Sequence, residues 1–475
     1  MTEKESKGKR LEKKLAYKRK CFWMKASKAE QKQAYEFSKG YCNFLDEGRT
    51  ERKVVDVTKR ILIKNGFVEI GDKTPKNANK LYKINRGKNI AIAKLGKQSI
   101  SRGFNLIVAH IDSPRVDLKQ VPLYEDSNTG LALMHTHYYG GIKKYQWMSI
   151  PLAIYGVVVK ENGEKIEISI GDKKDDPVFT FADLLIHLSK DQYKKKIGEA
   201  IDADKLILLF GSIPYPDKDM KDKIKLNCLN ILQEKYGISE EDFISAELEI
   251  VPAFPTKDVG IDRSMIGGYG HDDRICSYSS LKAILDLPSS GNESPSIVFL
   301  TDKEEIGSEG NTGAKSSFLW DFISDIIDYS GMDSSKIFRK VLFNSNILSA
   351  DVNVAINPAF SDKHEKQNAA LLGYGVCLTK FTGSRGKSGS NDANAEFVAK
   401  IRNILNKNKI VWQTGELGKV DIGGGGTIAK FMAEYGANVI DCGTPIIGMH
   451  SPFEIASKGD LFSTYKAYKA FFTLK

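Results

Sequence analysis

Two adjacent glutamates, Glu304 and Glu305, are the residues of this sequence best placed to do chemistry. They follow Ile297–Leu300, an apolar run with two β-branched members that predicts a buried strand. Enzymes built on parallel sheets place catalytic groups just beyond the carboxyl ends of such strands. Neighbouring side chains there point to different sides, so one carboxylate can bind a metal ion while the other transfers a proton. An isolated Glu-Glu pair, however, more often lies in a solvated acidic loop.

Four other short segments contribute histidines and carboxylates, most of them at the end of a strand-like run. Taken alone, each has a structural reading, such as a buried histidine satisfied by a neighbour, a turn or a helix cap. Taken together, they supply what two-metal hydrolysis requires: imidazole and carboxylate ligands from several strand ends, one bridging carboxylate and a nearby base. The segments are His110-Ile-Asp112, Gly270-His-Asp272-Asp273, Ser349-Ala-Asp351 and Gly448-Met-His450.

The residue types indicate which role each segment would have in binding metal ions. His110 can bind a metal while Asp112 accepts a hydrogen bond from its other ring nitrogen, and Asp272 can bridge two cations with Asp273 orienting nearby groups. Bringing so many acids together without cations would cost several kcal/mol, even at an effective dielectric constant of about 20. If the segments converge, we therefore expect a pair of divalent ions, and Zn²⁺, Co²⁺ and Mn²⁺ all suit such ligands.

The elements that must position these residues predict an α/β fold with a mostly parallel sheet flanked by helices. Strand-like and helical patterns alternate after residue 256, with strands at Ile297–Leu300, Val341–Ala350, Lys409–Trp412 and Asn438–Cys442, and helices at Phe318–Tyr329, Asn394–Asn406 and Thr427–Tyr435. Between them and the N-terminal half lies a segment richer in strands, where Asn162-Gly163 marks a hairpin. We expect a basic arm at 1–25, a discontinuous catalytic domain at 26–121 and 256–475, and an inserted domain at 122–255.

Composition narrows the possible classes of protein. The chain has 475 residues, of which 41% are hydrophobic and 27% charged, as in ordinary globular proteins. No apolar run is long enough to span a membrane and no signal-peptide core is present, so we expect a cytoplasmic protein with no membrane partner. Six cysteines without a Cys-x-x-Cys pair indicate reduced thiols and argue against a thiolate zinc site.

A net charge of +10 raises the alternative of nucleic-acid binding. Much of the excess lies in Lys9–Lys20, which has a helix-friendly composition but no aromatic platform or base-reading motif. We therefore expect no nucleic-acid partner, and a basic nucleic-acid-binding protein is the remote alternative.

The ordered set of five motifs resembles the aspartyl aminopeptidase/aminopeptidase I family of dinuclear metallopeptidases. The match runs from about Ala26 to Lys475 and includes Thr301-Asp-Lys-Glu-Glu-Ile-Gly-Ser308. The resemblance implies a zinc-peptidase-like catalytic domain, an inserted β-rich dimerisation domain, and hydrolysis of the N-terminal residue from peptides with a free N-terminus. It implies two divalent ions, with zinc favoured over cobalt or manganese. One ion would be held by His110, Asp272 and Glu305, and the other by Asp272, Asp351 and His450.

The resemblance also assigns further roles. Glu304 would be the general base, Asp112 would orient His110, and the Asp272–Asp273 peptide bond would be cis. Relatives assemble as a dimer-based dodecamer in which a histidine of the inserted domain reaches the neighbouring active site, and here that residue is His187 in Leu184-Leu-Ile-His-Leu. Lys380 lies near the lysine that pairs with acidic N-terminal residues of substrates. Val354 and Asn357 replace histidines of the eukaryotic relatives, which leaves the preferred N-terminal residue open.

Several residues and functions stay open at this point. A two-metal carboxypeptidase, amidase or deacylase could use the same ligands. His135 and His137 have ligand-like spacing but favour a structural or interface role, and His364 has no role that we can derive. Gly423–Gly426 lacks the lysine of a phosphate-binding loop, so close backbone approach to substrate or tight helix packing fits it better.

Overall fold

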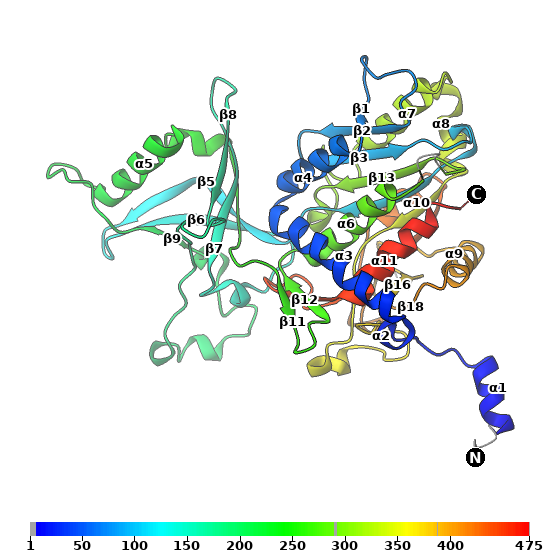
Figure 1. The fold of residues 1–475 in the computed structure, drawn as a ribbon. Helices are drawn as coiled ribbons and strands as arrows, with labels where there is room; N and C mark the ends of the chain where they lie inside the picture. Colours follow the sequence, from blue (N-terminus) through cyan, green and yellow to red (C-terminus); the bar gives the residue numbers. More distant parts are fainter. Residues whose placement is uncertain (1–5, 289–291, 387, 475) are drawn as a thin grey trace.

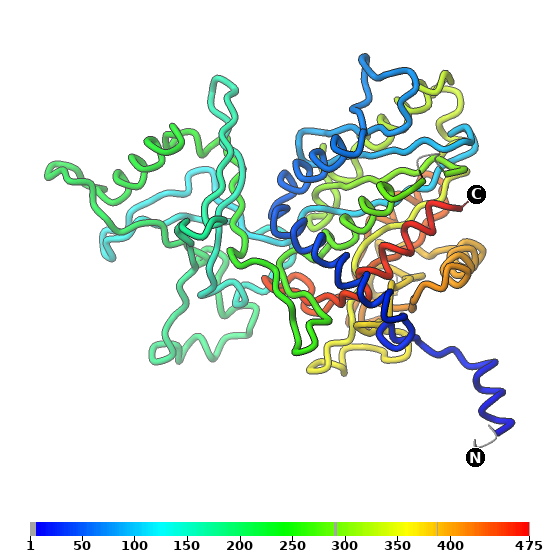
Figure 2. The backbone as a smooth tube through the Cα atoms, in the orientation of Figure 1, coloured from blue at the N-terminus to red at the C-terminus, as the bar shows by residue number. Residues whose placement is uncertain are grey.

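The protein folds into two lobes, each built around its own β-sheet (Figure 1). The computed structural model describes residues 6–288, 292–386 and 388–474. A nine-stranded sheet with helices on both faces forms the larger lobe, and a six-stranded sheet forms the smaller one. The chain passes from the larger lobe to the smaller and back again, as the backbone trace in Figure 2 shows. The mixed α/β class expected from the sequence is confirmed.

The N-terminal region forms four helices: α1 (Lys7–Leu15), α2 (Phe22–Lys25), α3 (Lys28–Glu47) and α4 (Glu51–Lys64). Helix α1 has no buried residue and projects away from both lobes (Figure 1). Helices α3 and α4 begin where Ser27 and Thr50 accept hydrogen bonds from backbone N–H groups of the first turn, as expected of N-cap residues.

The nine-stranded sheet has the order β1-β2-β3-β13-β4-β14-β20-β16-β18. Its four central strands, β13, β4, β14 and β20, run parallel to one another, and antiparallel pairs occur toward both edges. Parallel strands end at the same edge, so residues that follow β13, β4 and β14 come together. The strand bounds are Val68–Glu69 (β1), Lys80–Asn85 (β2), Asn89–Lys94 (β3), Asn105–His110 (β4), Ser296–Thr301 (β13), Asn346–Ser349 (β14), Val376–Thr379 (β16), Trp412–Thr414 (β18) and Asn438–Gly443 (β20).

Alternating residues of the central strands pack into two cores, one on each face of the sheet. In β4, Ile107 and Ala109 join the core under α3, α4, α6 (His271–Leu285), α9 (Ala395–Lys407) and α11 (Lys458–Phe471). Leu106 and Val108 join the opposite core under α7 (Phe318–Tyr329), α8 (Ser334–Phe343) and α10 (Ala429–Ala433).

Two strand predictions in this lobe were partly wrong. The apolar run at Val341 belongs to the last turns of α8, so only Asn346–Ser349 is a strand. Strand β18 begins at Trp412, later than expected. In both places a short apolar run fits a buried helix end or a loop as well as it fits a strand, and periodicity alone does not separate them.

The smaller lobe is a six-stranded antiparallel sheet in the order β8-β7-β10-β5-β6-β9. It has its own core, which includes Trp147 and Phe181, and helix α5 (Lys223–Tyr236) packs against it. The hairpin expected around Asn162-Gly163 is the turn between β7 and β8. The strands are Arg115–Asp126 (β5), Leu131–Tyr139 (β6), Leu152–Val159 (β7), Lys165–Ile170 (β8), Leu208–Gly211 (β9) and Ala246–Pro252 (β10).

A five-stranded sheet beside the large one carries the remaining segments of interest, in the order β11-β12-β22-β21-β15. Asp272 follows β12, His450 lies between β21 and β22, and Asp351 precedes β15. These strands are Lys257–Val259 (β11), Met265–Gly268 (β12), Asn353–Val354 (β15), Pro445–Ile447 (β21) and Glu454–Ser457 (β22), and a separate ribbon pairs β17 (Gly383–Ser384) with β19 (Gly424–Gly425). Among the helices that the structure describes, none is both long enough and apolar enough to cross a membrane.

Candidate metal centre

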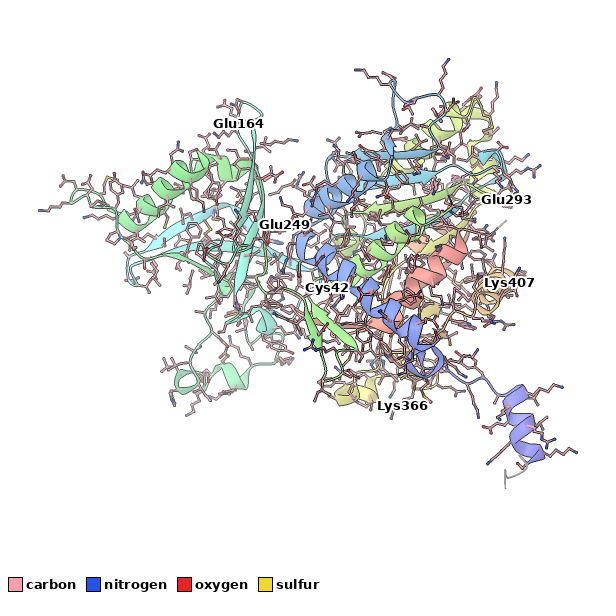
Figure 3. The ribbon with its side chains drawn as sticks, viewed as in Figure 1. Cys42, Glu164, Glu249, Glu293, Lys366 and Lys407 are labelled. Atoms are coloured by element: carbon pink, nitrogen blue, oxygen red, sulfur yellow. The ribbon has the colours of Figure 1, made fainter. Side chains whose placement is uncertain are left out.

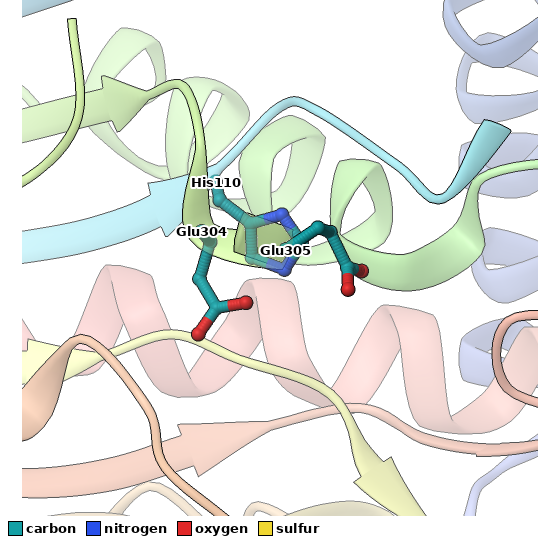
Figure 4. A group of neighbouring side chains, drawn as sticks. All are labelled: His110, Glu304 and Glu305. Carbon is teal, nitrogen blue, oxygen red and sulfur yellow. The ribbon is translucent and has the colours of Figure 1, made fainter. Parts of the chain in front are cut away.

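Three parallel strands end together and deliver the first group of candidate residues. His110 is the last residue of β4 and pairs in register with Thr301, the last residue of β13. Glu304 and Glu305 follow in the short 3₁₀ helix η7 (Glu304–Ile306), and Figure 4 shows both beside the His110 ring. Asp351 comes just after β14, which pairs with the other edge of β4. The parallel strands thus bring residues that are far apart in the sequence into one cluster.

Asp272 lies between the two imidazoles of the cluster. Its Oδ1 atom is 3.1 Å from His110 Nε2, and its Oδ2 atom is 3.2 Å from His450 Nε2. The Asp272–Asp273 peptide bond is cis, as the resemblance implied. One carboxylate that presents each oxygen to a different imidazole has the geometry of a bridging ligand.

Glu305 and Asp351 extend the cluster on opposite sides of Asp272. Glu305 Oε2 lies 3.4 Å from His450 Nε2, and Asp351 Oδ1 lies 4.0 Å from His110 Nε2. The ligand atoms therefore form one group with His110, Asp272 and Asp351 and another with Asp272, Glu305 and His450. This grouping exchanges Glu305 and Asp351 relative to the pairing that the resemblance implied. A further group joins His110 to Glu304 and Glu305.

Both imidazoles are oriented by backbone carbonyl groups. His110 Nδ1 lies 3.0 Å from the carbonyl oxygen of Asp112, and His450 Nδ1 lies 2.9 Å from that of Gly141. Because a carbonyl oxygen can only accept, each Nδ1 carries a proton, and Nε2 is the ring nitrogen that faces the carboxylates. A protonated Nδ1 held by a carbonyl oxygen leaves Nε2 as the atom through which each imidazole would bind a metal ion.

The Asp112 carboxylate organises the loop of the two glutamates more directly than it organises His110. Its oxygens accept hydrogen bonds from the backbone N–H groups of Glu304 and Glu305 at 3.1 and 3.2 Å, and from the Tyr139 hydroxyl at 2.8 Å. The carboxylate itself is 3.4 Å from His110 Nδ1, farther than the Asp112 carbonyl oxygen. Burial opposes ionisation, but the hydrogen bonds from His110 and Tyr139 lower the pKa of Asp112.

The cluster carries more buried negative charge than its own residues neutralise. Burial raises the pKa of Glu304 to about 7 and holds the pKa of Glu305 and of Asp351 well above the ordinary range. The pKa of Asp272 is instead lowered despite burial, by hydrogen bonds from His110 and His450. Among the described residues, buried Glu305 Oε1 has no hydrogen-bond partner. Imidazole nitrogens and carboxylate oxygens that lack cations are a donor set that fits Zn²⁺.

Glu454, at the start of β22, was not singled out from the sequence. Its buried carboxylate accepts hydrogen bonds from the backbone N–H of His450 at 2.7 Å and of Asp272 at 3.1 Å. Burial raises its pKa to about 8. No sequence signal marks this residue, because its role depends on two segments that only the tertiary fold places beside β22.

Comparison with known proteins agrees with this geometry. The family model described as “Aminopeptidase I zinc metalloprotease (M18)” matches residues 44–472. Proteins named “Probable M18 family aminopeptidase 1” are 52% identical over 438 residues in Thermotoga maritima (91% of this chain, 95% of the relative) and 48% identical over 454 residues in Clostridium acetobutylicum (94% and 97%). The chain belongs to the M18 family of aminopeptidases.

Solved structures of M18 aminopeptidases share the fold. The crystal structure of the Thermotoga maritima aminopeptidase superposes with a TM-score of 0.92 at 50% identity, covering 96% of this chain and 99% of that one. The mApe1 protein of yeast, whose structure is that of a dodecamer, shares the fold at 23% identity and a TM-score of 0.72, covering 93% and 96%. The resemblance seen in the sequence is confirmed, and this protein is a metalloaminopeptidase that hydrolyses peptide bonds.

A cavity of about 310 Å³ opens beside Asp351 in this M18 aminopeptidase. The glycine run at Gly423–Gly425 forms part of its wall, where Gly424 has a φ of +118° and lies against the backbone of Gly383. The backbone that Gly424 approaches is thus that of Gly383, and the expected close approach to substrate stays a prediction. Arg385 and the buried Asp441 also line the cavity, and the sequence alone did not single out either of them.

Lys380 lines a neighbouring cavity that shares Phe381 and Glu416 with the first. Its ammonium nitrogen is 2.6 Å from Asp392 Oδ1 and 4.1 Å from the centre of the Phe381 ring. Lys380 is therefore close to the cavity beside Asp351 but is paired within the chain. Its predicted contact with substrate stays a prediction.

The other residues singled out from the sequence lie apart from the metal centre. His187 is on the exposed 3₁₀ helix η3 (Ile186–Leu188) of the smaller lobe, and the ligand groups found among the described residues do not include it. The His135 ring stacks on Tyr124, and the His137 ring lies against the Tyr138 backbone. His364 is buried, and burial lowers its pKa. All six cysteines are free, as expected.

Proposed function

We propose that this M18 aminopeptidase uses two divalent metal ions, zinc by preference, to release the N-terminal residue of peptides. The observation that carries the proposal is the position of Asp272, whose two oxygens lie 3.1 and 3.2 Å from Nε2 of His110 and of His450. One ion would be held by His110, Asp272 and Asp351, and the other by Asp272, Glu305 and His450. When bound, the ions act as Lewis acids and lower the pKa of a water molecule from about 15.7 to about 7.

Glu304 is proposed as the general base. Its backbone N–H donates to Asp112 Oδ1, which fixes the start of η7, while its side chain lies beside His110. A partly buried carboxylate next to the candidate metal ligands can take a proton from water and return it to the leaving amine in the same catalytic cycle. Glu305, its neighbour, points toward His450 and would bind metal instead.

The proposed ions would also account for a requirement for a free N-terminus. One of the ions would bind the neutral α-amine of the substrate, whereas the acylated nitrogen of a blocked N-terminus is a much weaker ligand. The side chain of the first residue would enter the cavity beside Asp351, and Lys380 is proposed to contact acidic side chains there. A carboxypeptidase, amidase or deacylase does not require a free amine next to the bond that it cleaves, so recognition of the amine would not favour its substrates.

We further propose that residues 122–255, whose sheet begins at Arg115, form an inserted oligomerisation domain. The segment around η3 exposes a group of large apolar side chains, which monomeric proteins rarely display together. A second copy of the chain is the partner that the dodecamer of the mApe1 relative favours. In such an assembly His187 would contribute to the neighbouring active site. The exposed residues are Leu184, Leu185, Ile186, Leu188, Tyr193 and Ile197.

The test is turnover on aminoacyl substrates with free and acetylated N-termini. We expect hydrolysis only of the free amines, loss of activity on chelation, and recovery when Zn²⁺, Co²⁺ or Mn²⁺ is added, with two ions bound per chain by elemental analysis. Hydrolysis of acetylated substrates at an equal rate would favour the deacylase or carboxypeptidase alternatives. A single bound ion at full activity would contradict the two-metal mechanism.

A further inference from the structure

Three consecutive residues of the smaller lobe, Tyr139, Gly140 and Gly141, lie beside three different residues of the metal centre. Tyr139 ends β6, where it pairs with Arg115 of β5, and the two glycines follow it. The segment therefore belongs to the six-stranded sheet by its hydrogen bonding. The metal centre lies at the edge of the other, nine-stranded sheet.

The first contact is made by the Tyr139 hydroxyl, which donates to Asp112 Oδ2 at 2.8 Å. The backbone N–H groups of Glu304 and Glu305 also donate to this carboxylate, and His110 Nδ1 lies 3.4 Å from it. Among the described residues, Tyr139 is the only one whose side-chain hydroxyl donates to Asp112, and the Asp112 carboxylate holds the backbone of both glutamates in place. Without this hydroxyl, the Asp112 carboxylate would be held less firmly, and so would the loop that carries the two glutamates.

The Tyr139 ring is itself fixed by buried charges. The Arg115 guanidinium lies over it at 3.9 Å from the ring centre, in the geometry of a cation–π contact. Arg115 is in turn held 3.3 Å from Glu249 of β10 and 3.5 Å from Glu51 at the start of α4. Glu249 lies where the two lobes meet (Figure 3). The tyrosine is therefore anchored to both lobes.

Gly141 makes the second contact, and Gly140 leaves room for the side chain of Glu305. The Gly141 carbonyl oxygen accepts the hydrogen bond from His450 Nδ1 at 2.9 Å that sets the tautomer of this imidazole. Gly140 has a φ of +71°, and a Cβ atom added to it would lie 3.2 Å from Cβ of Glu305. A residue larger than glycine would push against the glutamate.

We propose that Tyr139–Gly141 is a positioning element through which the smaller lobe sets the geometry of the metal centre. The inference rests on the proposed two-metal function. Tyr139 would act through Asp112 on Glu304 and Glu305, and Gly141 would act through His450. The lobe expected to mediate assembly would then be required for metal binding as well, because it completes the hydrogen bonds around the ligands.

The first experiment compares Tyr139→Phe with Tyr138→Phe. Phenylalanine keeps the ring on Arg115 and removes only the hydroxyl that Asp112 accepts, whereas Tyr138 is 43% exposed and lies outside the centre. We expect Tyr139→Phe to weaken Zn²⁺ binding by about 10- to 100-fold in titrations of metal-free protein, and to change the visible absorption spectrum of the Co²⁺ form. The value of kcat should fall more than KM changes, and the melting temperature of metal-free protein should match that of Tyr138→Phe.

The second experiment compares Gly140→Ala with Gly163→Ala. Both glycines have positive φ angles, +71° and +83°, so both substitutions strain the backbone alike. Only Gly140 has a neighbour, because a Cβ atom at Gly163 meets nothing within 4 Å. We expect Gly140→Ala to weaken Zn²⁺ binding and Gly163→Ala to leave it unchanged.

The outcomes separate this inference from the proposed function. If Tyr139→Phe and Gly140→Ala bind Zn²⁺ as tightly as their controls and keep the Co²⁺ spectrum, the segment is ordinary packing and the inference is wrong, while a chelator-sensitive wild type would leave the two-metal function intact. If the wild type binds no metal and ignores chelation, the function itself fails. Equal losses in a variant and its control would also overturn the inference, because they would show a general effect on the lobe.

Discussion

Asp272 and His450 are in contact in the metal centre, with Oδ2 of the aspartate 3.2 Å from Nε2 of the histidine. The two residues come from different elements, the start of α6 and the loop between β21 and β22. The Glu454 carboxylate accepts a hydrogen bond from the backbone N–H group of each. The other oxygen of Asp272 faces His110. A carboxylate held in this way can bridge two ions only if both of its oxygens are present.

The first prediction concerns that bridge. Replacing Asp272 by Asn keeps the size of the side chain but removes its charge and one acceptor oxygen. We expect the bound metal to fall from two ions to one or none and turnover to be abolished. Elemental analysis after gel filtration measures this directly, with Asp219→Asn, in an exposed loop, as the control. Two tightly bound ions in Asp272→Asn would show that Asp272 does not bridge.

The second prediction separates the two adjacent glutamates. Glu304→Gln should lower kcat by about 10²- to 10⁴-fold with metal content unchanged, because only the base is lost. Glu305→Gln should lose metal, because its carboxylate lies beside His450. Rates and metal content measured on both variants test the division of labour. Wild-type turnover in Glu304→Gln would remove it from the mechanism.

The third prediction concerns His187, which lies on exposed η3 in the smaller lobe. If it acts in a neighbouring subunit, a chain carrying Glu304→Gln can still supply His187 to a chain carrying His187→Ala. Co-expressed mixtures of the two variants should then be several-fold more active than the sum of the separate proteins. Activity no greater than that sum would place His187 outside the neighbouring site.

The fourth prediction concerns the side chain of the first substrate residue. If Lys380 leaves Asp392 to pair with an acidic side chain, Lys380→Met should lower kcat/KM for glutamyl and aspartyl substrates by roughly 10- to 100-fold and spare leucyl substrates, as expected for a lost charged hydrogen bond. Arg385→Met is the matched comparison, because Arg385 lines the cavity beside Asp351. A selective loss in Arg385→Met alone would move the contact to the arginine.

The fifth prediction concerns stability and pH. Buried Asp460 accepts hydrogen bonds from the N–H groups of Gly373 and Gly375, yet burial raises its pKa to about 8, above the value of about 3.9 in an unfolded chain. Between these values the folded state binds the extra proton, so the free energy of unfolding should fall as pH rises, by up to about 1.4 kcal/mol per pH unit.

Urea unfolding of metal-free protein from pH 5 to 8 measures this slope. The variant Asp460→Asn cannot ionise, so its free energy of unfolding should decrease less steeply across the same range. Equal slopes in the two proteins would show that Asp460 does not titrate in this range.

The sequence by itself determined the chemistry of this protein and many of its elements. Residue types at the ends of apolar runs identified the six side chains that converge, from His110 to His450, and the helix at Phe318–Tyr329 lies where periodicity predicted it. These features are local, since a strand end and the residue that follows it are set by a few neighbouring residues. The run at Val341 was misread for the same reason, because a short apolar stretch does not reveal whether it packs as helix or strand.

Only the tertiary structure decided how these residues are held. The grouping of Asp351 with His110 and of Glu305 with His450, and the bonds from Tyr139, Gly141 and Glu454, join segments that lie far apart in the chain. Such contacts depend on strand order and on the docking of one lobe against another, which no local pattern encodes. The candidate ligands could therefore be named from the sequence, whereas the hydrogen bonds that orient them appeared only in the fold.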